Sequence, residues 1–514
     1  MARSVALPQG GADSAAAAAS TTEADITDTM GKGAEGSDVS GSRFRVAIAG
    51  AGFSGAILAR HLAARSDVEV VCFESMSQES VRKHWTQPVT GAGLNINPNA
   101  MATLRHYDPE LELAMRGIGL PRESVRAFTV TGRAVYAADM EQQGLADTTG
   151  CRVRWDDANT LIRKMAGDCI QWETTVDSHT VGADGKVTLT LSHADGTTST
   201  AADFDLLVAG EGRYSPIRNR VNGGTVPATF GDVCNFRILV PNAQPDGQPW
   251  PEEMGPAGLF DDLQLIYNET PTTENLSNDS PLLADPDFTG CVMRSTPRVG
   301  IMRIPRSKFK EEVGESLYIF GNFAIPPGGE IPESSKTAEA MHCLFTPAEG
   351  EAALTPEGLF IRDTLTRNAD KLHWARFQDI PVQFTDETGH VLMLGDAAHA
   401  FCPSLGQGAT TSIEDACVAS SELCASLDAS GGQREAMARM LPSTLEKIAA
   451  RQADRVSFIR DISTEAGHHL RFHKGATDGR SALDDDAAAW LDDGHHTGWR
   501  GKVRRMWLDY PRPC

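Results

Sequence analysis

The chain has 514 residues and a formal net charge of −22 at pH 7, with 47 basic side chains against 69 acidic ones. This length allows two or three packed units, and the negative charge argues against nucleic acid or an anionic membrane surface as partner. No apolar stretch reaches the ~20 residues that cross a bilayer, so we expect no transmembrane segment. The ten cysteines are scattered without metal-ligand spacing, which predicts reduced thiols, no metal site and a cytoplasmic location.

Residues 1–42 are rich in Ala, Ser, Thr, Gly and Asp and contain no large apolar cluster. Such a segment cannot bury enough surface to offset the entropy lost on ordering. We therefore predict a disordered leader. It lacks the apolar core of a secretory signal, and its acidic residues count against a transit peptide without excluding organelle targeting.

The most informative stretch, residues 45–74, has the pattern of a nucleotide-binding βαβ unit. An apolar strand leads into Gly50, Gly52 and Gly55, then into a helix and a second strand that ends at Glu74. These glycines allow a tight turn, a close approach of the backbone to a pyrophosphate, and close packing of helix on strand. A carboxylate at the end of the second strand favours an adenosine ribose with a free 2′-hydroxyl, as in FAD or NAD. The predicted cofactor contacts here are Gly50, Gly52, Ser54, Gly55 and Glu74.

Beyond this unit the pattern predicts a turn and short strand at 91–97, a helix that starts near Pro98, and a second helix at 154–166. Strands are expected at 187–191 and 204–209. From about residue 226 to 382 the chain changes to short β-type runs, at 236–240, 263–267, 299–304 and 317–323, which indicate an antiparallel sheet and a second domain. A buried strand at 391–396, a glycine-bearing loop, a helix through Glu414 and Asp415, and helical segments at about 433–466 follow.

Two further motifs accompany the first: the segment 205–218, with Glu211 and Gly212, and the segment 395–408, which begins with Gly395 and Asp396. In this order and spacing, the chain resembles the single-component FAD-dependent monooxygenases, including the salicylate hydroxylase-like aromatic hydroxylases. The resemblance implies an α/β fold: a Rossmann-like FAD-binding domain (GR2-type), an inserted antiparallel-sheet substrate domain and a C-terminal helical segment. The expected ranges are a leader at 1–42, FAD-binding parts at 43–225 and 383–430, the substrate domain at 226–382 and the C-terminal segment at 431–514.

The resemblance also implies roles for individual residues. Asp396 would bind the ribitol near the pyrophosphate, and Arg154 would hold the ribitol and phosphates. The peptide N–H groups of Gly406, Gln407, Gly408 and Ala409, at a helix start, would face the pyrimidine edge of the flavin, where positive helix-end dipoles stabilise the reduced state. The carbonyl of Pro403 would line the face where oxygen reacts. The family usually has Asp-Gly where this chain has Glu211-Gly212, which leaves the reductant site open.

The implied reaction is flavin-centred. NADPH or NADH would reduce FAD and leave, and O2 would form a C4a-hydroperoxide that is attacked by a small, electron-rich aromatic substrate. No catalytic side chain and no metal would be needed. Possible substrate contacts are Phe236, Arg237, Arg303 and Phe320, either arginine being able to meet a carboxylate, although the same positions also fit ordinary strand residues. The alternatives are a dehydrogenase or reductase on the same scaffold and a catalytically silent flavin-binding homologue.

Overall fold

The computed structural model describes residues 43–78, 92–141, 149–254, 258–268, 270–294, 297–326, 329–469 and 499–511. The predicted leader, residues 1–42, lies outside the described residues. The remainder, from Ser42 on, is one compact unit by its internal contacts.

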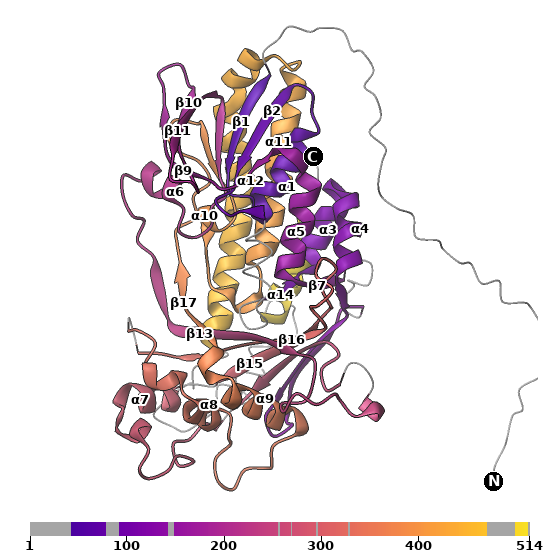
Figure 1. Cartoon of the computed structure of the whole chain (residues 1–514), viewed down its shortest axis with the longest axis vertical. Coiled ribbons are helices and arrows are strands. Elements are labelled where there is room, and N and C mark those ends of the chain that lie inside the picture. Colours follow the sequence, from indigo (N-terminus) through magenta and orange to yellow (C-terminus); the bar gives the residue numbers. More distant parts are fainter. Residues whose placement is uncertain are drawn as a thin grey trace, which may run out of the picture. The chain divides into compact units, whose positions relative to one another are not determined.

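A five-stranded parallel sheet forms the upper part of this unit in Figure 1. Its order is β18 (Val391–Met393), β12 (Leu206–Ala209), β1 (Phe44–Ala49), β2 (Val68–Phe73) and β8 (Ile170–Gln171). The strands β12, β1 and β18 are nearly continuous apolar runs, the composition that a parallel strand buried on both faces requires. The βαβ unit predicted from the glycine pattern is confirmed, with α1 (Phe53–Ala63) between β1 and β2.

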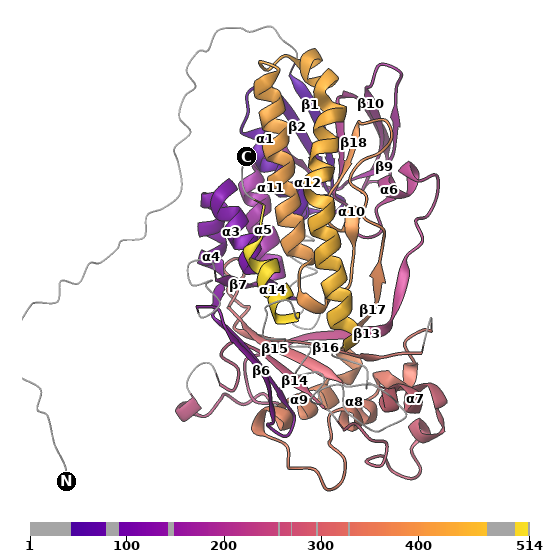
Figure 2. The ribbon, with the colours of Figure 1, turned by 180° about the vertical axis from the view of Figure 1, so that it is seen from behind.

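Helices pack on this sheet and on each other. Figure 2 shows α11 and α12 in front of the strands, and α1 contacts both α11 and α5. Their bounds are α5 (Trp155–Ala166), α11 (Gly408–Ala429) and α12 (Arg434–His469). A three-stranded antiparallel meander of β9 (Thr174–Val181), β10 (Val187–His193) and β11 (Thr198–Phe204) packs against β1 and β2. The expected helix at 154–166 and strand at 187–191 are therefore confirmed.

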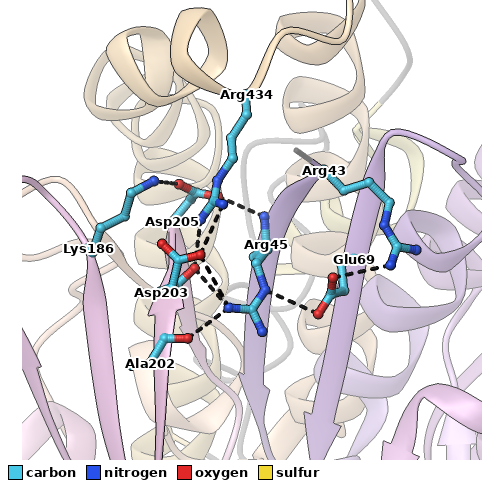
Figure 3. A network of polar contacts seen from close by, with 8 residues as sticks. All are labelled: Arg43, Arg45, Glu69, Lys186, Ala202, Asp203, Asp205 and Arg434. Atoms are coloured by element: carbon cyan, nitrogen blue, oxygen red, sulfur yellow. Dashed lines mark hydrogen bonds and ion pairs between the residues drawn. The ribbon is translucent and has the colours of Figure 1, made fainter. Parts of the chain in front are cut away.

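A network of ion pairs and hydrogen bonds lies at the amino-terminal edge of the parallel sheet (Figure 3). The buried carboxylate of Asp205 accepts hydrogen bonds from the Arg45 backbone N–H and the Arg434 side chain, both at 2.8 Å, and pairs with Lys186. Arg45 also donates to Glu69 at 3.1 Å. A buried carboxylate requires such compensation. These polar groups lie at the strand starts, which leaves the opposite, carboxyl-terminal edge free for a ligand.

The second large sheet has seven strands, in the order β17-β13-β16-β15-β14-β5-β6. Their bounds are β17 (His373–Asp379), β13 (Thr229–Pro241), β16 (Ser316–Ala324), β15 (Arg298–Ile304), β14 (Leu263–Tyr267), β5 (Ser124–Thr129) and β6 (Ala134–Asp139). The four strand runs expected between 236 and 323 are confirmed. The sheet also takes the hairpin β5–β6 from much earlier in the chain, and β5 runs parallel to β14. No tight turn joins β5 to β14, so their relative direction is not restricted to antiparallel.

The two faces of this sheet have different neighbours. One face packs on α7 (Pro286–Arg294), α8 (Ala338–Leu344) and α9 (Pro356–Arg367), through a core that contains Phe236, Phe345 and Phe360. The other face lies toward the end of α12 and toward α14 (Trp499–Leu508), which Figure 2 shows between the long helices and the sheet. This second face is the one that meets the carboxyl-terminal edge of the parallel sheet.

Smaller elements complete the unit. A three-stranded antiparallel sheet consists of β3 (Gly93–Ile96), β7 (Gly150–Arg154) and β4 (Leu120–Arg122). The helices α3 (Pro98–Tyr107) and α4 (Pro109–Ile118) both contact β7. Two short helices, α6 (Pro216–Val221) and α10 (Asp396–His399), start directly after motif residues. In the described ranges we find no helix with the length and apolarity needed to span a bilayer.

Candidate active site

The three motifs meet at the carboxyl-terminal ends of three neighbouring strands, β1, β12 and β18. Their turns pack tightly on one another. A Cβ on Gly50 would lie 2.6 Å from the carbonyl oxygen of Gly210, and a Cβ on Gly55 would lie 2.0 Å from the carbonyl oxygen of Gly50. Gly50 also has φ +92°, a conformation that favours glycine. Gly50 is therefore required by a backbone contact with a segment more than 150 positions away, and Gly55 by a backbone contact within its own turn.

Gly52 differs from its two neighbours because nothing crowds it. A Cβ there would meet only the Gly210 carbonyl oxygen, at 3.9 Å. Gly52 is the N-cap of α1, with no side chain capping the helix and no acidic residue in the first turn. The free N–H groups and the helix dipole at this end form an anion site that a backbone-close phosphate can reach.

Glu74, at the end of β2, is buried and holds the turn together. Its Oε2 accepts hydrogen bonds from the Ala51 N–H at 2.9 Å and from Arg163 at 3.2 Å, and its Oε1 accepts from the Met76 N–H at 3.0 Å. Arg163 also donates to the Ala51 carbonyl at 2.7 Å. Burial lowers the pKa of Arg163, and the Glu74 carboxylate opposes that shift. No local pattern marks Arg163 as a site residue, because it is one of several charged residues on an amphipathic helix.

The Gly395-Asp396 turn follows β18 and faces the start of α11. Gly395 has φ +59°, and a Cβ there would lie 2.7 Å from Ser412 Oγ and 3.1 Å from Ser54 Oγ. The Asp396 carboxylate is half-exposed, with only a long ion pair of 3.8 Å to Arg213. It lies 3.8 Å from where a Cβ on Gly408 would be. Asp396 thus presents an available carboxylate between two uncapped helix starts.

The loop before α11 is held by amide side chains. Asn97 Nδ2 donates to the Gly406 carbonyl at 2.9 Å, and Asn99 Nδ2 donates to Gln407 Oε1 at 3.1 Å. Asn99 also donates to Glu414, whose carboxylate is paired bidentately with Arg455. Helix α11 has no side-chain cap and no acid in its first turn. The positions predicted to face the flavin's pyrimidine edge are therefore fixed, with their N–H groups uncapped.

Behind this loop, His399 and Asp415 form a buried pair. The His399 ring nitrogen Nε2 lies 2.6 Å from Asp415 Oδ2, and the same carboxylate accepts from the Gly395 N–H at 2.9 Å and from Gln452 at 2.7 Å. Burial by itself would lower the pKa of His399, but the Asp415 carboxylate raises it above its usual value. The pair positions the Gly395-Asp396 turn, which gives His399 a structural role.

Glu211 lies at the end of β12 beside Gly50. Its Oε2 accepts from Ser215 Oγ at 3.0 Å, whereas its Oε1 has no hydrogen-bond partner in the described residues. Burial raises the pKa of Glu211 from 4.5 to about 7. Gly212 follows with φ +87° and open space around it.

Arg154 is buried, but its contacts point toward the second sheet. Its guanidinium donates to Ser316 Oγ at 3.1 Å and lies 3.6 Å from Asp156. The adjacent Asp157 accepts from Ser307 Oγ at 2.6 Å. These contacts fasten the start of α5 to the β15–β16 connection. Arg154 is not among the described residues that line the cavity next to the flavin loop, so its proposed cofactor role stays a prediction.

A cavity of about 320 Å³ lies between the loop at 403–409 and the second sheet. Its walls are mostly apolar or aromatic, and they come from β3, β5, β13–β16, the start of α11 and α14. Of the predicted flavin-facing residues, Pro403, Gly406, Gly408 and Ala409 line it. The cavity therefore joins the flavin loop to the open face of the seven-stranded sheet.

The four predicted substrate contacts are divided by the alternation of the strands. Arg237 and Phe320 line the cavity and are directly paired across β13 and β16. Phe236 is fully buried on the opposite face, against Phe345. Arg303 also lies outside the cavity lining, 4.0 Å from Asp261. The prediction for Phe236 and Arg303 is thus not supported, because neighbouring residues in a strand point to opposite faces.

Several cavity residues were not anticipated from the sequence. Tyr318 stacks on Phe320 with ring centroids 5.3 Å apart. Trp507, in the last helix, packs under the Arg122 guanidinium, 5.0 Å from it. Arg298 also belongs to the lining. Tyr318, Trp507 and Arg298 lie in strands or helices whose packing partners are distant in sequence, so local patterns could not assign these residues to a site.

Comparison with known proteins agrees with this geometry. A family model described as an FAD binding domain matches residues 366–436. FAD-dependent monooxygenase pigN of Monascus ruber is 26% identical over 73% of this chain and 75% of its own length. FAD-dependent monooxygenase sor5 of Hypocrea jecorina is 25% identical, over 74% and 75%. The structure of Klebsiella pneumoniae HpxO complexed with FAD and uric acid has a TM-score of 0.60 at 18% identity, covering 90% of this chain and 96% of that one.

The fold and the convergent glycine turns define a flavoprotein oxidoreductase. Over about three quarters of its length the chain is similar to FAD-dependent monooxygenases, which agrees with the family predicted from the three motifs. A salicylate hydroxylase substrate complex also shares the fold, with a TM-score of 0.57 at 19% identity over 92% of this chain and all of that one.

The residues present fit FAD. Gly52 and Gly408 leave backbone-close space, the starts of α1 and α11 are uncapped, and the Asp396 carboxylate is available between them. FAD binding is accordingly the part of the cofactor prediction that is confirmed. No cluster of His, Cys, Asp and Glu suited to a metal ion occurs in the part of the chain that the structure describes.

Proposed function

We propose that this monooxygenase takes its electrons from NADPH or NADH, which docks transiently, and inserts one oxygen atom of O2 into a small aromatic substrate. FAD, when bound, supplies electron storage and oxygen activation. The protein's own contribution is to bind, orient and exclude water. The observation that carries the proposal is the cavity of about 320 Å³, which is bounded by the flavin loop on one side and by Tyr318 and Phe320 on the other.

The walls of the cavity suit a flat, apolar body. Stacked aromatic side chains favour an aromatic ring by offset or edge contacts. Leu263, Leu265 and Met302 add aliphatic surface from β14 and β15, and Val503 and Met506 cover the other side from α14. Such an enclosure keeps water from the reacting atoms, which protects a reactive oxygen species from unproductive decay. A concave, mostly apolar site with a few polar groups is also the usual form of a small-molecule site.

The first turn of α11 supports the electron-transfer half of the proposal. Its uncapped N–H groups offer positive dipole ends to a ligand edge that becomes negative on reduction. Asn97 and Asn99 fix the loop from outside, so that little reorganisation is needed when charge develops. Among relatives, HpxO is solved with FAD and uric acid, a flat heterocycle, and this supports a substrate of similar shape here.

Stopped-flow reduction of the FAD-loaded protein by NADPH and by NADH, across a library of phenols and aromatic acids, tests the proposal. We expect at least one ring compound to accelerate flavin reduction, and its product to take one oxygen atom from ¹⁸O₂. Reduction followed only by hydrogen peroxide release, with every compound unchanged, would contradict the hydroxylase. A flavin that neither nicotinamide cofactor reduces would favour a silent homologue.

A further inference from the structure

The charge of the cavity is opposite to that of the whole protein. Its described lining contains the arginines Arg122, Arg237 and Arg298 and no aspartate, glutamate, lysine or histidine. The chain as a whole carries a net charge of −22. A pocket with several guanidinium groups and no acid, in an acidic protein, attracts an anionic ligand from solution and holds it once it is desolvated.

Two of the arginines already have partners inside the protein. Arg122 donates to Asn97 Oδ1 at 3.1 Å and lies over the Trp507 ring. It therefore braces the asparagine that holds the flavin loop. Burial raises the pKa of Tyr318, and the neighbouring Arg237 guanidinium opposes that shift. Neither pairing supplies a counter-charge.

The Arg298 side chain forms no hydrogen bond or ion pair with the residues that the structure describes, and it stacks on no aromatic ring there. Only 4% of Arg298 is exposed, yet it lines the cavity at the start of β15. A guanidinium that faces a cavity without a protein counter-charge is available to pair with an anionic ligand there. Arg298 is directly opposite Asn322, which is in turn opposite Asn235, so this end of the cavity face is a polar row.

We propose that the substrate is an aromatic acid whose carboxylate pairs with Arg298, and that Arg298 selects such acids over neutral analogues of the same shape. This inference rests on the proposed function only in taking the cavity as the substrate site. A planar carboxylate matches the guanidinium in a bidentate pair, while the apolar walls take the ring. Arg298 is thus a specificity-determining residue that contacts the substrate away from the flavin loop.

The test compares 2,4-dihydroxybenzoate with 2,4-dihydroxybenzamide, and 1-hydroxy-2-naphthoate with its amide, on the FAD-loaded protein. Binding is followed by perturbation of the flavin absorbance, without any reductant. For at least one pair we expect the acid to bind about 10-fold to 100-fold more tightly than the amide, the range of a charge-assisted bidentate hydrogen bond. In Arg298→Gln that preference should fall to about 3-fold or less, and Arg298→Lys should keep part of it.

A matched control is Arg126→Gln. Arg126 is exposed and lies between the cavity-lining Val125 and Ala127, so it points to the other face of the same sheet. It should keep the full preference for acids. The melting temperature of flavin-free Arg298→Met should equal or exceed that of the native protein, because no hydrogen bond or ion pair to a described residue is lost and the methionine side chain packs against the apolar walls. A lower melting temperature would indicate a structural role and overturn the assignment.

Equal binding of acid and amide in every pair, or an acid preference that survives in Arg298→Gln, would also overturn the inference. Measurements of turnover distinguish a failure of this inference from a failure of the proposed function. Arg298-dependent binding of acids without oxygen transfer would uphold the inference and reject the hydroxylase. Hydroxylation of neutral phenols that is insensitive to Arg298→Gln would do the reverse.

Discussion

At the carboxyl-terminal edge of the parallel sheet, the groups available to a ligand are mainly backbone atoms, glycines and one free carboxylate. On the cavity face of the seven-stranded sheet they are side chains: arginines, aromatic rings and aliphatic groups. The crowded positions of the backbone site, Gly50, Gly55 and Gly395, tolerate almost no change, because a Cβ at any of them would collide with neighbouring atoms. A side-chain site can change its lining without changing the fold, so under the proposed function the first site binds the cofactor and the second selects the substrate.

Gly55→Ala should have the largest effect, because its Cβ would lie 2.0 Å from the Gly50 carbonyl oxygen. The backbone must shift to relieve this contact, and we expect a loss of about 3 kcal/mol or more in the free energy of unfolding. Thermal unfolding and flavin content of the purified protein would measure it. Gly117→Ala is the control: nothing lies within 4 Å of a Cβ in α4, so the protein should be as stable as the native one or slightly more stable. An unchanged Gly55→Ala protein would refute the close packing.

Gly52→Ala should change the affinity for FAD without changing the stability of the flavin-free protein. The new methyl group meets only the Gly210 carbonyl oxygen, at 3.9 Å, so the flavin-free protein should melt at nearly the native temperature. The same methyl group occupies the space next to the α1 start where the pyrophosphate approaches. We expect the FAD dissociation constant to rise by about 100-fold, measured by quenching of flavin fluorescence. Native affinity would mean that the pyrophosphate lies elsewhere.

Asp396→Ala should weaken FAD by about 10-fold to 100-fold, the value of hydrogen bonds to a charged group. The carboxylate is half-exposed and makes only the long contact to Arg213, so the unfolding temperature of the flavin-free protein should change little. Isothermal titration with FAD gives the affinity. Asp396→Asn, which keeps an acceptor oxygen, should be intermediate, and equal losses in both variants would contradict a hydrogen-bonding role.

Glu211→Gln tests the buried carboxyl beside the glycine turn. Burial raises its pKa from 4.5 to about 7, so the folded state holds a proton that the unfolded state has already released. Stability must therefore fall as the pH rises from about 4.5 to about 7 and stay low above that. Glutamine cannot ionise, and the variant should gain about 1–3 kcal/mol over the native protein near pH 8 and almost nothing near pH 4. A gain that does not depend on pH would exclude this explanation.

Phe236 and Phe320 offer a smaller test, on opposite faces of the seven-stranded sheet. Phe236→Leu should lower the free energy of unfolding by about 1 kcal/mol and leave the affinity for a ring compound unchanged, since its ring is in the core under α8 and α9. Phe320→Leu should weaken that affinity by about 3-fold to 10-fold through the loss of an aromatic contact. Chemical denaturation and ligand titration of both variants would show the division. Equal effects on affinity would contradict the assignment of faces.

The parallel sheet and its motif turns could be predicted because their signals are local. The runs at β1, β12 and β18 are apolar enough to mark buried strands, and glycines at fixed offsets mark the turns. The seven-stranded sheet was predicted less completely. Its hairpin β5–β6 comes from residues 124–139, far from the other strands, and no local pattern indicates which edge it joins.

The sequence by itself determined the dinucleotide-binding turn and the resemblance to FAD-dependent monooxygenases, because these restrictions come from backbone geometry, which glycine positions record directly. Only the tertiary structure decided which side chains share the cavity: Arg237 and Phe320 line it, Phe236 and Arg303 do not, and Arg298 and Trp507 join from distant segments. The physical reason is that a residue's face in a strand depends on its pairing partners, and its burial depends on what packs above it. The sequence within a few residues of a position specifies neither the face on which its side chain lies nor how deeply it is buried.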